Sequence, residues 1–230
     1  MSVAEQLGLG SGELVAIVGA GGKSTLLLGL GRELSTAGSS VVMTTTTKMG
    51  ADQLPDWAVA CRTSGEVDSA IAAGQPVFLL EGVDSSKIVG AAAAVVDEAF
   101  ARRDVDFVLA EADGAAGQLL KAPAQHEPVI PATTTLVVVV VGLGSVGGRI
   151  AAVTHRPERV AALLGCGVDH VLEPIDLATV ITHPRGGMWH VPDTARVVAA
   201  LTGDNEPAAS KVRELLAPEP RIERVVVVGR

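Results

Sequence analysis

Six short runs of apolar residues, most of them β-branched, recur along the 230-residue chain and constrain its fold more than any other feature. Most are apolar at every position, which is typical of strands buried on both faces in a parallel sheet. Helix-like segments separate them, and this order predicts an α/β fold with right-handed crossovers. The predicted strands are Leu14–Val18, Val41–Met43, Val77–Leu80, Phe107–Ala110, Leu136–Val141 and Val225–Val228. The clearest predicted helices are Ser24–Thr36, Ala91–Arg103 and Pro207–Leu216. Asp204 or Asn205 is expected to cap the last of these helices.

Composition and charge narrow the class of protein. Hydrophobic residues make up 48% of the chain and charged residues 19%, which predicts an ordered chain. Aromatic residues make up only 2%, so the core must be aliphatic. The net charge of −8, without a basic stripe, argues against binding to nucleic acid. We expect a single α/β domain over residues 1–230, with a less regular insertion or cap at about 142–191.

The cysteine spacing and the lengths of the apolar runs indicate the cellular compartment of the protein. Cys61 and Cys166 lie too far apart in sequence for a disulfide framework or a metal cluster, and they indicate reduced thiols in the cytoplasm. Met1–Gly12 lacks the basic and apolar regions of a signal peptide. The longest apolar run, Leu136–Leu143, is far shorter than the roughly 20 residues of a membrane-spanning helix. We therefore expect a cytoplasmic protein without a membrane partner.

A glycine-rich segment, Gly19-Ala20-Gly21-Gly22-Lys23-Ser24-Thr25, follows the first predicted strand and opens the first long helix. It resembles a phosphate-binding P-loop, in which glycines let successive N–H groups converge on one anion at a helix N-terminus. Lys23 would reach the β- and γ-phosphates, and the Ser24 hydroxyl would ligate Mg²⁺. The loop is two residues shorter than the usual G-x-x-x-x-G-K-[ST], which would need glycine where Ile17 stands. The segment Gly19–Thr25 is therefore the predicted nucleotide-binding loop.

Polar residues also follow two other predicted strands. Thr44–Thr47 and Lys48 come after the second strand, and the carboxyl ends of parallel strands share one edge of the sheet. We expect Thr45 to bind Mg²⁺ or a phosphate oxygen and Lys48 to offset phosphate charge. Glu111 and Asp113 come just after the strand Phe107–Ala110, at the place where the strand of a Walker-B element carries its carboxylate. Glu111 is therefore a candidate Mg²⁺ ligand, and Asp113 a candidate catalytic residue that orients water or a hydroxyl.

The segment after Asp113 holds two further catalytic candidates. Lys121 and His126, with Glu127, lie in a loop that Pro123, Pro128 and Pro131 stiffen. A rigid loop that presents charged side chains is a candidate substrate wall. Lone Lys and His residues in loops are otherwise usually solvated, so each could also be a surface residue.

A second glycine pattern offers an alternative. Gly142-Leu143-Gly144-Ser145-Val146-Gly147 follows a predicted strand and matches the dinucleotide-binding G-x-G-x-x-G. It lies in mid-chain, and the helix that should follow is interrupted at His155-Arg156-Pro157. NAD(P) binding is thus the weaker alternative. In the P-loop interpretation this turn lies beside the phosphate site, where Arg149, His155 and Arg156 could supply positive charge.

Taken together, these motifs resemble the YqeC family, usually named selenium-dependent hydroxylase accessory proteins. The matching segments are Val18–Thr25, Thr44–Met49, Glu111–Ala115, Lys121–Pro123, His126–Pro131, Val141–Leu143 and His155–Pro157, which span about two thirds of the chain. The resemblance implies a P-loop NTPase-like three-layer fold, with helices on both faces of a mostly parallel sheet. It also implies a role in maturing selenium-dependent molybdenum hydroxylases, which would be partners of this protein.

The expected function is a Mg²⁺-dependent ATP- or GTP-binding protein that acts as an NTPase or transfers a phosphoryl or nucleotidyl group. Relatives often carry an Asn-x-x-Asp motif that is reminiscent of guanine recognition, but this chain has Leu201-Thr202-Gly203-Asp204, so both nucleotides stay open. Glu111 also resembles the strand-end Glu that serves the Mg²⁺ site in dethiobiotin synthetase. The main alternative is a module that binds a molybdopterin nucleotide without hydrolysing it.

Overall fold

The computed structural model describes residues 1–229, and its internal contacts divide the chain into two compact units. Unit 1 comprises Met1–Ile17, Ser24–Asp113 and Val129–Leu136. Unit 2 comprises Val18–Lys23, Gly114–Pro128 and the chain from Val137 onward. The expectation of a single domain with an insertion stays a prediction.

Unit 1 is built on a sheet whose central strands are parallel. The strand β1 (Glu13–Gly19) pairs with β7 (Phe107–Glu111), which pairs with β2 (Val41–Thr45). The next strand, β5 (Val77–Asp84), pairs in parallel with β2 and with the short β4 (Val59–Cys61). The sheet continues through two antiparallel strands, β6 (Lys87–Gly90) and β3 (Lys48–Gly50), the latter followed by the 3-10 turn η1 (Ala51–Gln53).

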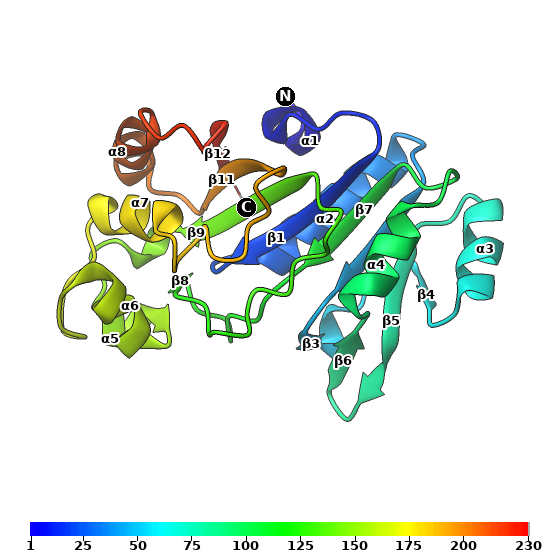
Figure 1. Ribbon diagram of the computed structural model, residues 1–230, viewed down its shortest axis with the longest axis horizontal. Helices are drawn as coiled ribbons and strands as arrows, with labels where there is room; N and C mark the ends of the chain where they lie inside the picture. The colour runs from blue at the N-terminus through cyan, green and yellow to red at the C-terminus, as the bar shows by residue number, and fades with distance from the viewer. Residues whose placement is uncertain (230) are drawn as a thin grey trace. The chain divides into compact units, whose positions relative to one another are not determined.

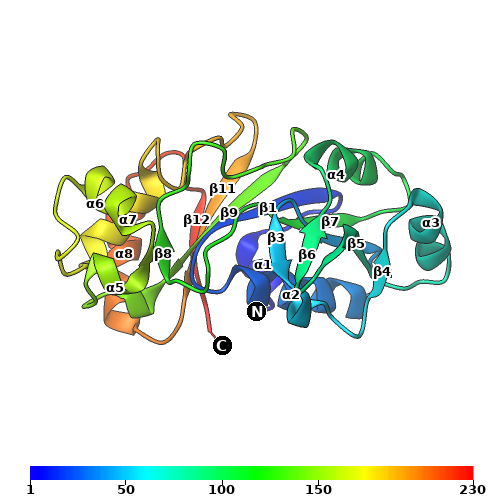
Figure 2. The same cartoon turned by 90° about the horizontal axis from the view of Figure 1, so that it is seen from below.

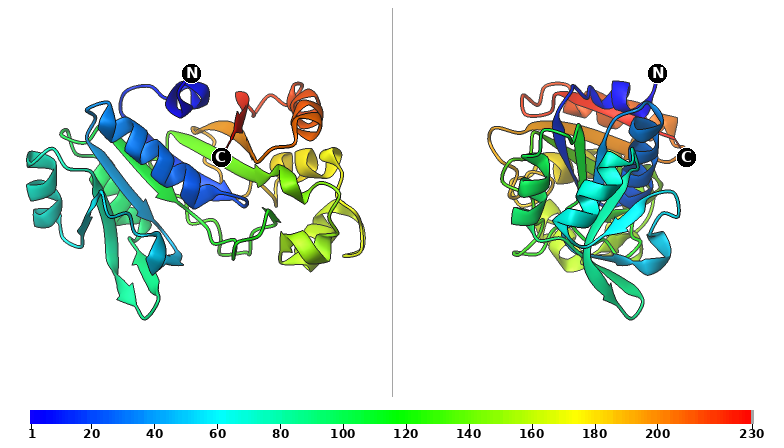
Figure 3. Two further views of the ribbon diagram at one scale, coloured as in Figure 1. Left: turned by 180° about the vertical axis from the view of Figure 1, so that it is seen from behind. Right: turned by 90° about the vertical axis from the view of Figure 1, so that its right-hand side faces the viewer.

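Helices cover both faces of the sheet in unit 1 (Figures 1 and 3). The helices α3 (Ser64–Ala72) and α4 (Ala93–Phe100) share a buried cluster with Val42, Val108 and other sheet residues. On the opposite face lies α2 (Lys23–Thr36), where Gly31 leaves room for the side chain of Met43. Because Val42 and Met43 face opposite layers, both must be apolar. The α/β fold with a mostly parallel sheet and helices on both faces is thus confirmed. Unit 1 also contains the short helix α1 (Val3–Leu7).

Unit 2 contains the neighbouring strands β9 (Leu136–Gly142), β11 (Arg196–Thr202) and β12 (Arg224–Val228), of which β11 and β12 are parallel. Its helices are α5 (Ile150–Val153), α6 (Pro157–Leu164), α7 (Pro174–Thr182) and α8 (Glu206–Leu216), with α6 packed on α5 and α7, and α7 on α8 (Figure 2). A small parallel ribbon joins β8 (Leu120–Lys121) to β10 (Thr154–His155).

The predicted elements agree with the structure in most places. The expected helices at Ser24–Thr36 and Pro207–Leu216 are confirmed, and Asn205 caps α8 by accepting a 3.2 Å hydrogen bond from the Ala208 N–H. The helix expected over Ala91–Arg103 is shorter, Ala93–Phe100. The strand β11 was not expected. Among residues 1–229, no helix combines the length and apolar character that crossing a bilayer requires.

We predict that Gly90→Ala destabilises the protein. A methyl group on Gly90 would collide with the Thr45 carbonyl oxygen and lie 2.6 Å from the carbonyl carbon, both of which are backbone atoms of β2. Overpacking against atoms that cannot rotate away should lower the free energy of unfolding by about 2 kcal/mol, measured by urea denaturation. Gly82→Ala is the matched control, because a Cβ there meets nothing within 4 Å. Equal effects of the two substitutions would contradict the prediction.

Candidate functional site

The glycine-rich loop after β1 takes a backbone shape that only glycines adopt without strain. Gly19, Gly21 and Gly22 have φ angles of 95°, 88° and 118°, all in the left-handed half of conformational space. The helix α2 then begins at Lys23. The predicted order of strand, glycine turn and helix, with Lys23 and Ser24 at the helix start, is therefore present.

Two of these glycines also let the loop approach neighbouring backbone in unit 2. A Cβ at Gly19 would collide with the Val140 carbonyl oxygen, which accepts a 2.9 Å hydrogen bond from the Ala20 N–H. A Cβ at Gly21 would lie 2.5 Å from the amide nitrogen of Gly142 and 2.9 Å from the carbonyl oxygen of Leu119. The Thr202 hydroxyl donates a hydrogen bond to the Gly21 carbonyl. The loop is thus fixed from several sides.

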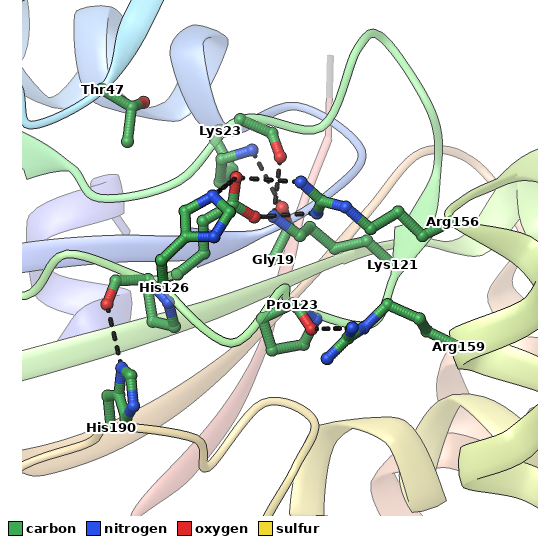
Figure 4. Close-up of polar contacts among 12 residues, drawn as sticks. Gly19, Lys23, Thr47, Lys121, Pro123, His126, Arg156, Arg159 and His190 are labelled. Atoms are coloured by element: carbon green, nitrogen blue, oxygen red, sulfur yellow. Dashed lines mark hydrogen bonds and ion pairs between the residues drawn. The ribbon is translucent and has the colours of Figure 1, made fainter.

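Lys23 turns its ammonium group back over this loop. Its Nζ donates a 2.9 Å hydrogen bond to the Gly19 carbonyl oxygen, as Figure 4 shows, and the residue is only 4% exposed. A buried lysine that folds back over a glycine loop at a helix start is positioned as the lysine that stabilises phosphate oxygens in P-loops.

Ser24 and Glu111, the predicted Mg²⁺ ligands, lie together in unit 1. Ser24 Oγ donates a 2.7 Å hydrogen bond to Glu111 Oε2. The register places Glu111 opposite Ile17 of β1 and Thr45 of β2, and Thr45 Oγ1 donates to the Glu111 carbonyl at 3.0 Å. Hydroxyl and carboxylate oxygens are the ligands that Mg²⁺ prefers, and two oxygens this close can occupy neighbouring corners of its octahedron. The donor set therefore fits Mg²⁺, and the metal role stays a prediction.

The other polar residues of the threonine segment have different surroundings. The hydroxyls of Thr44 and Thr46 donate to the backbone carbonyls of Leu79 and Val129, both at 2.8 Å. Lys48 lies on β3, where its Nζ is 3.3 Å from an Asp84 carboxylate oxygen, and both side chains are largely exposed. The phosphate-binding roles expected for Thr45 and Lys48 stay predictions.

Asp113 follows β7 and is 2% exposed. Hydrogen bonds from the Ala112 N–H to the Ile17 carbonyl and from the Val129 N–H to the Ala112 carbonyl, both 2.9 Å, fix the backbone before it. The backbone that carries the Asp113 side chain is therefore held by both neighbouring segments.

Lys121 lies on β8 and not in a loop as expected, and together with Glu127 of the following loop it belongs to a buried ion cluster in unit 2. Glu127 accepts hydrogen bonds from Lys121 Nζ at 2.9 Å and from both terminal nitrogens of Arg156 at 2.8 and 3.0 Å. Lys121 Nζ also donates to the Gly114 carbonyl at 2.6 Å. His126 has a side chain that is 80% exposed, with Nε2 3.9 Å from Glu127 Oε1. The structure thus brings Lys121 and His126 to the same carboxylate.

Two pKa shifts follow from this cluster. Burial raises the pKa of Glu127, but the hydrogen bonds and charges of Arg156 and Lys121 outweigh it and lower this pKa to about 2. The pKa of His155 is lowered by burial first, and then by the charges of Arg156, Lys121 and Lys23. Glu127 is therefore ionised at neutral pH, and His155 is held toward its neutral form.

Arginines at the start of α6 join the loop. Arg156, the N-cap residue of α6, has left-handed backbone angles of φ 60° and ψ 66°. Arg159 was not predicted, and its Nε donates a 2.9 Å hydrogen bond to the Pro123 carbonyl. No local signal in the sequence indicated it, because Arg156 precedes α6 in a left-handed conformation and the i, i+3 spacing of helical residues does not apply to the two arginines. Arg149 lies apart from this cluster, largely exposed, with NH1 3.8 Å from Asp169.

The alternative dinucleotide motif has a different structural role. Gly142 is followed by the 3-10 turn η2 (Leu143–Ser145) and, after Gly147, by the four-residue helix α5. A Cβ at Gly142 would lie 3.0 Å from a side-chain carbon of Leu119. Gly142 and Gly144 thus serve close packing against Leu119, whereas Gly147 adopts a left-handed φ of 84°. The long helix whose N-terminus receives the pyrophosphate does not follow these glycines. The geometry argues against NAD(P) binding here.

The sequence comparisons with known proteins agree with the motifs. The family model described as YqeC protein matches residues 15–158. A protein of Escherichia coli (strain K12) named "Uncharacterized protein YqeC" is 32% identical over 188 residues, which cover 80% of this chain and 73% of that protein. The solved structure "Structure of chloroplast FtsY from Physcomitrella patens" matches with a TM-score of 0.48 and 16% identity, over 96% of this chain and 60% of that one.

We predict that Glu127 makes stability depend on pH below pH 4.5. Its folded-state pKa of about 2 lies below the ordinary value of 4.5, so the stabilisation is complete above pH 4.5 and is lost as pH falls toward 2. Across this range the wild type should lose on the order of 3 kcal/mol more unfolding free energy than Glu127→Gln. Urea denaturation at each pH measures the loss. The exposed Glu158→Gln should behave as wild type, and parallel curves for wild type and Glu127→Gln would refute the prediction.

Proposed function

The chain belongs to the YqeC family, and on that premise we propose that it is a nucleotide-binding P-loop protein. The observation that supports this most directly is the loop Gly19–Gly22, whose three left-handed glycines precede a helix start with Lys23 turned over the loop. Backbone N–H groups, a helix N-terminus and one buried ammonium together suit a polyphosphate. These groups supply positive potential locally, so the net charge of −8 does not exclude a small anionic ligand.

We propose that Ser24 and Glu111 hold Mg²⁺ when nucleotide is bound. No group of three or more His, Cys, Asp or Glu side chains within residues 1–229 is arranged for a metal, so phosphate and water oxygens would complete the coordination. This is usual for Mg²⁺, which keeps several waters and is bound through few carboxylates. The metal would offset charge on the phosphates and help to orient them.

We further propose that the protein hydrolyses the nucleotide or transfers a phosphoryl or nucleotidyl group. Lys23 would stabilise charge on the transferred group, and Asp113 would orient the attacking water or hydroxyl. Lys121, with a side chain that is 1% exposed and held by Glu127, would act as a fixed positive charge. His126, exposed beside the same carboxylate, is free to reach a substrate. ATP and GTP are equally compatible with these roles.

We predict that Lys23→Ala abolishes nucleotide binding. Thermal-shift measurements with Mg²⁺ and ATP or GTP should raise the Tm of the wild type by several degrees, because a ligand at a hundred times its Kd stabilises the fold by about 2.7 kcal/mol. Lys211→Ala is the control, since this lysine lies on α8 and pairs only at the surface with Glu214. Glu111→Gln should remove most of the Mg²⁺ dependence.

Thermal-shift measurements with ATP, GTP, NAD(P) and a molybdopterin nucleotide, each with and without Mg²⁺, distinguish the proposed function from its alternatives. Failure of both nucleotides to shift the wild type at millimolar concentration would overturn the proposal. A shift by NAD(P) that Gly144→Val removes would indicate the dinucleotide alternative. A shift by a molybdopterin nucleotide without phosphate release would indicate the non-hydrolysing module.

The family resemblance also supports a proposed role in maturing selenium-dependent molybdenum hydroxylases in the cytoplasm, where the free thiols of Cys61 and Cys166 would stay reduced. We predict that hydroxylase made in cells lacking this protein has reduced specific activity. Wild-type protein should restore that activity and Lys23→Ala should not, because the role would depend on the nucleotide. Full hydroxylase activity without the protein would refute the role, while nucleotide binding would stand on its own measurement.

A further inference from the structure

Two arginines near the start of α6 extend toward the loop that carries Pro123 and His126 (Figure 4). Arg156 reaches Glu127 with both terminal nitrogens, and Arg159 reaches the Pro123 carbonyl through Nε. Solvent reaches both side chains, because the Arg156 side chain is 27% exposed and Arg159 is an exposed residue. Within residues 1–229 the terminal nitrogens of Arg159 make no hydrogen bond.

The two guanidinium groups have different partners within unit 2. Arg156 donates to the Glu127 carboxylate, which also accepts a hydrogen bond from Lys121. Arg159 is held by a neutral carbonyl. Guanidinium groups that are fixed at one edge and open at the other suit the oxygens of a phosphate or a carboxylate.

This pair lies close to the glycine-rich loop through a short chain of contacts in unit 2. Gly21 packs against the Leu119 carbonyl, and Leu119 immediately precedes β8. In the ribbon, Lys121 of β8 stands opposite His155 of β10, and Arg156 follows His155. The imidazole of His155 responds to the charges of Arg156 and of Lys23, so both cations act on the same side chain.

We propose that Arg156 and Arg159 form a binding site for the phosphate group of a second, phosphorylated substrate. Its description as a second substrate rests on the proposed nucleotide function, because the nucleotide would occupy Gly19–Lys23. Phosphate is favoured over carboxylate because two separate guanidinium groups offer more donors than one carboxylate accepts, and a phosphate has three oxygens to receive them.

The experiment uses the full chain with inorganic phosphate as the probe and His155 as the reporter. The histidine ring resonances are followed by NMR against pH, with His155 assigned from the spectrum of His155→Gln. Phosphate bound beside Arg156 should raise the pKa of His155, because its charge offsets the cations that lower this pKa. Arg159→Gln should weaken the apparent phosphate affinity about tenfold, since it removes charged hydrogen bonds. The control Arg149→Gln should leave the affinity unchanged.

Further arms identify the site that the anion occupies. The phosphate-dependent shift should persist in Lys23→Ala and in wild type saturated with Mg²⁺ and ADP. Loss of the shift in either arm would mean that the anion binds the glycine-rich loop, which overturns the proposal. Absence of any shift, equal effects of Arg159→Gln and Arg149→Gln, or an equal response to acetate would also overturn it. Because the Lys23→Ala arm needs no nucleotide, failure of the proposed nucleotide function leaves this test intact.

Discussion

The close approach of the glycine-rich loop to the ends of the strands in unit 2 is the constraint on which the site depends. The loop fits only because residues 19 and 21 lack side chains, which would collide with backbone atoms of Val140, Gly142 and Leu119. Backbone cannot rotate away, so a side chain at either residue would displace the loop. The same contact aligns Leu119 and hence the ribbon of β8 and β10. The close fit of the loop thus places the ion cluster of Lys121, Glu127 and Arg156 near a loop whose positive potential comes from backbone dipoles.

A buried carboxylate organises the cluster that this ribbon carries. Burial alone would favour the neutral form of Glu127, and three charge-assisted hydrogen bonds reverse that preference. Since each partner would be costly to bury alone, the group is stable only as a set. Its members come from separate parts of the sequence: Lys121 from β8, Glu127 from the loop that follows it, and Arg156 from the start of α6. The ion cluster therefore joins two segments that also pair through the two-residue ribbon of β8 and β10.

Much of the fold was predictable because buried parallel strands have a strong local pattern. Val138 and its neighbours in β9 are apolar at every position, and β9 was expected. The strand β11 was not predicted, because Ala199 and Ala200 have little intrinsic preference for strands. Packing against neighbouring strands places them in the sheet. The pairing of Ser24 with Glu111 could be expected, since parallel register brings strand ends to one edge. Arg159 could not, because the path of the chain from Pro123 to α6 depends on nonlocal contacts.

The left-handed backbone of Arg156 sets backbone strain against ion pairing at this residue. A residue with a Cβ in this conformation costs about 1 kcal/mol relative to glycine, which adopts it freely. Glycine would fit the turn into α6 better, and it would remove the guanidinium that binds Glu127. Folding stability and electrostatics therefore make opposite demands on the same residue. After random mutagenesis with selection only for thermal resistance, glycine at position 156 would mean that relief of backbone strain stabilises the protein more than the bonds to Glu127. Retention of arginine would mean the opposite.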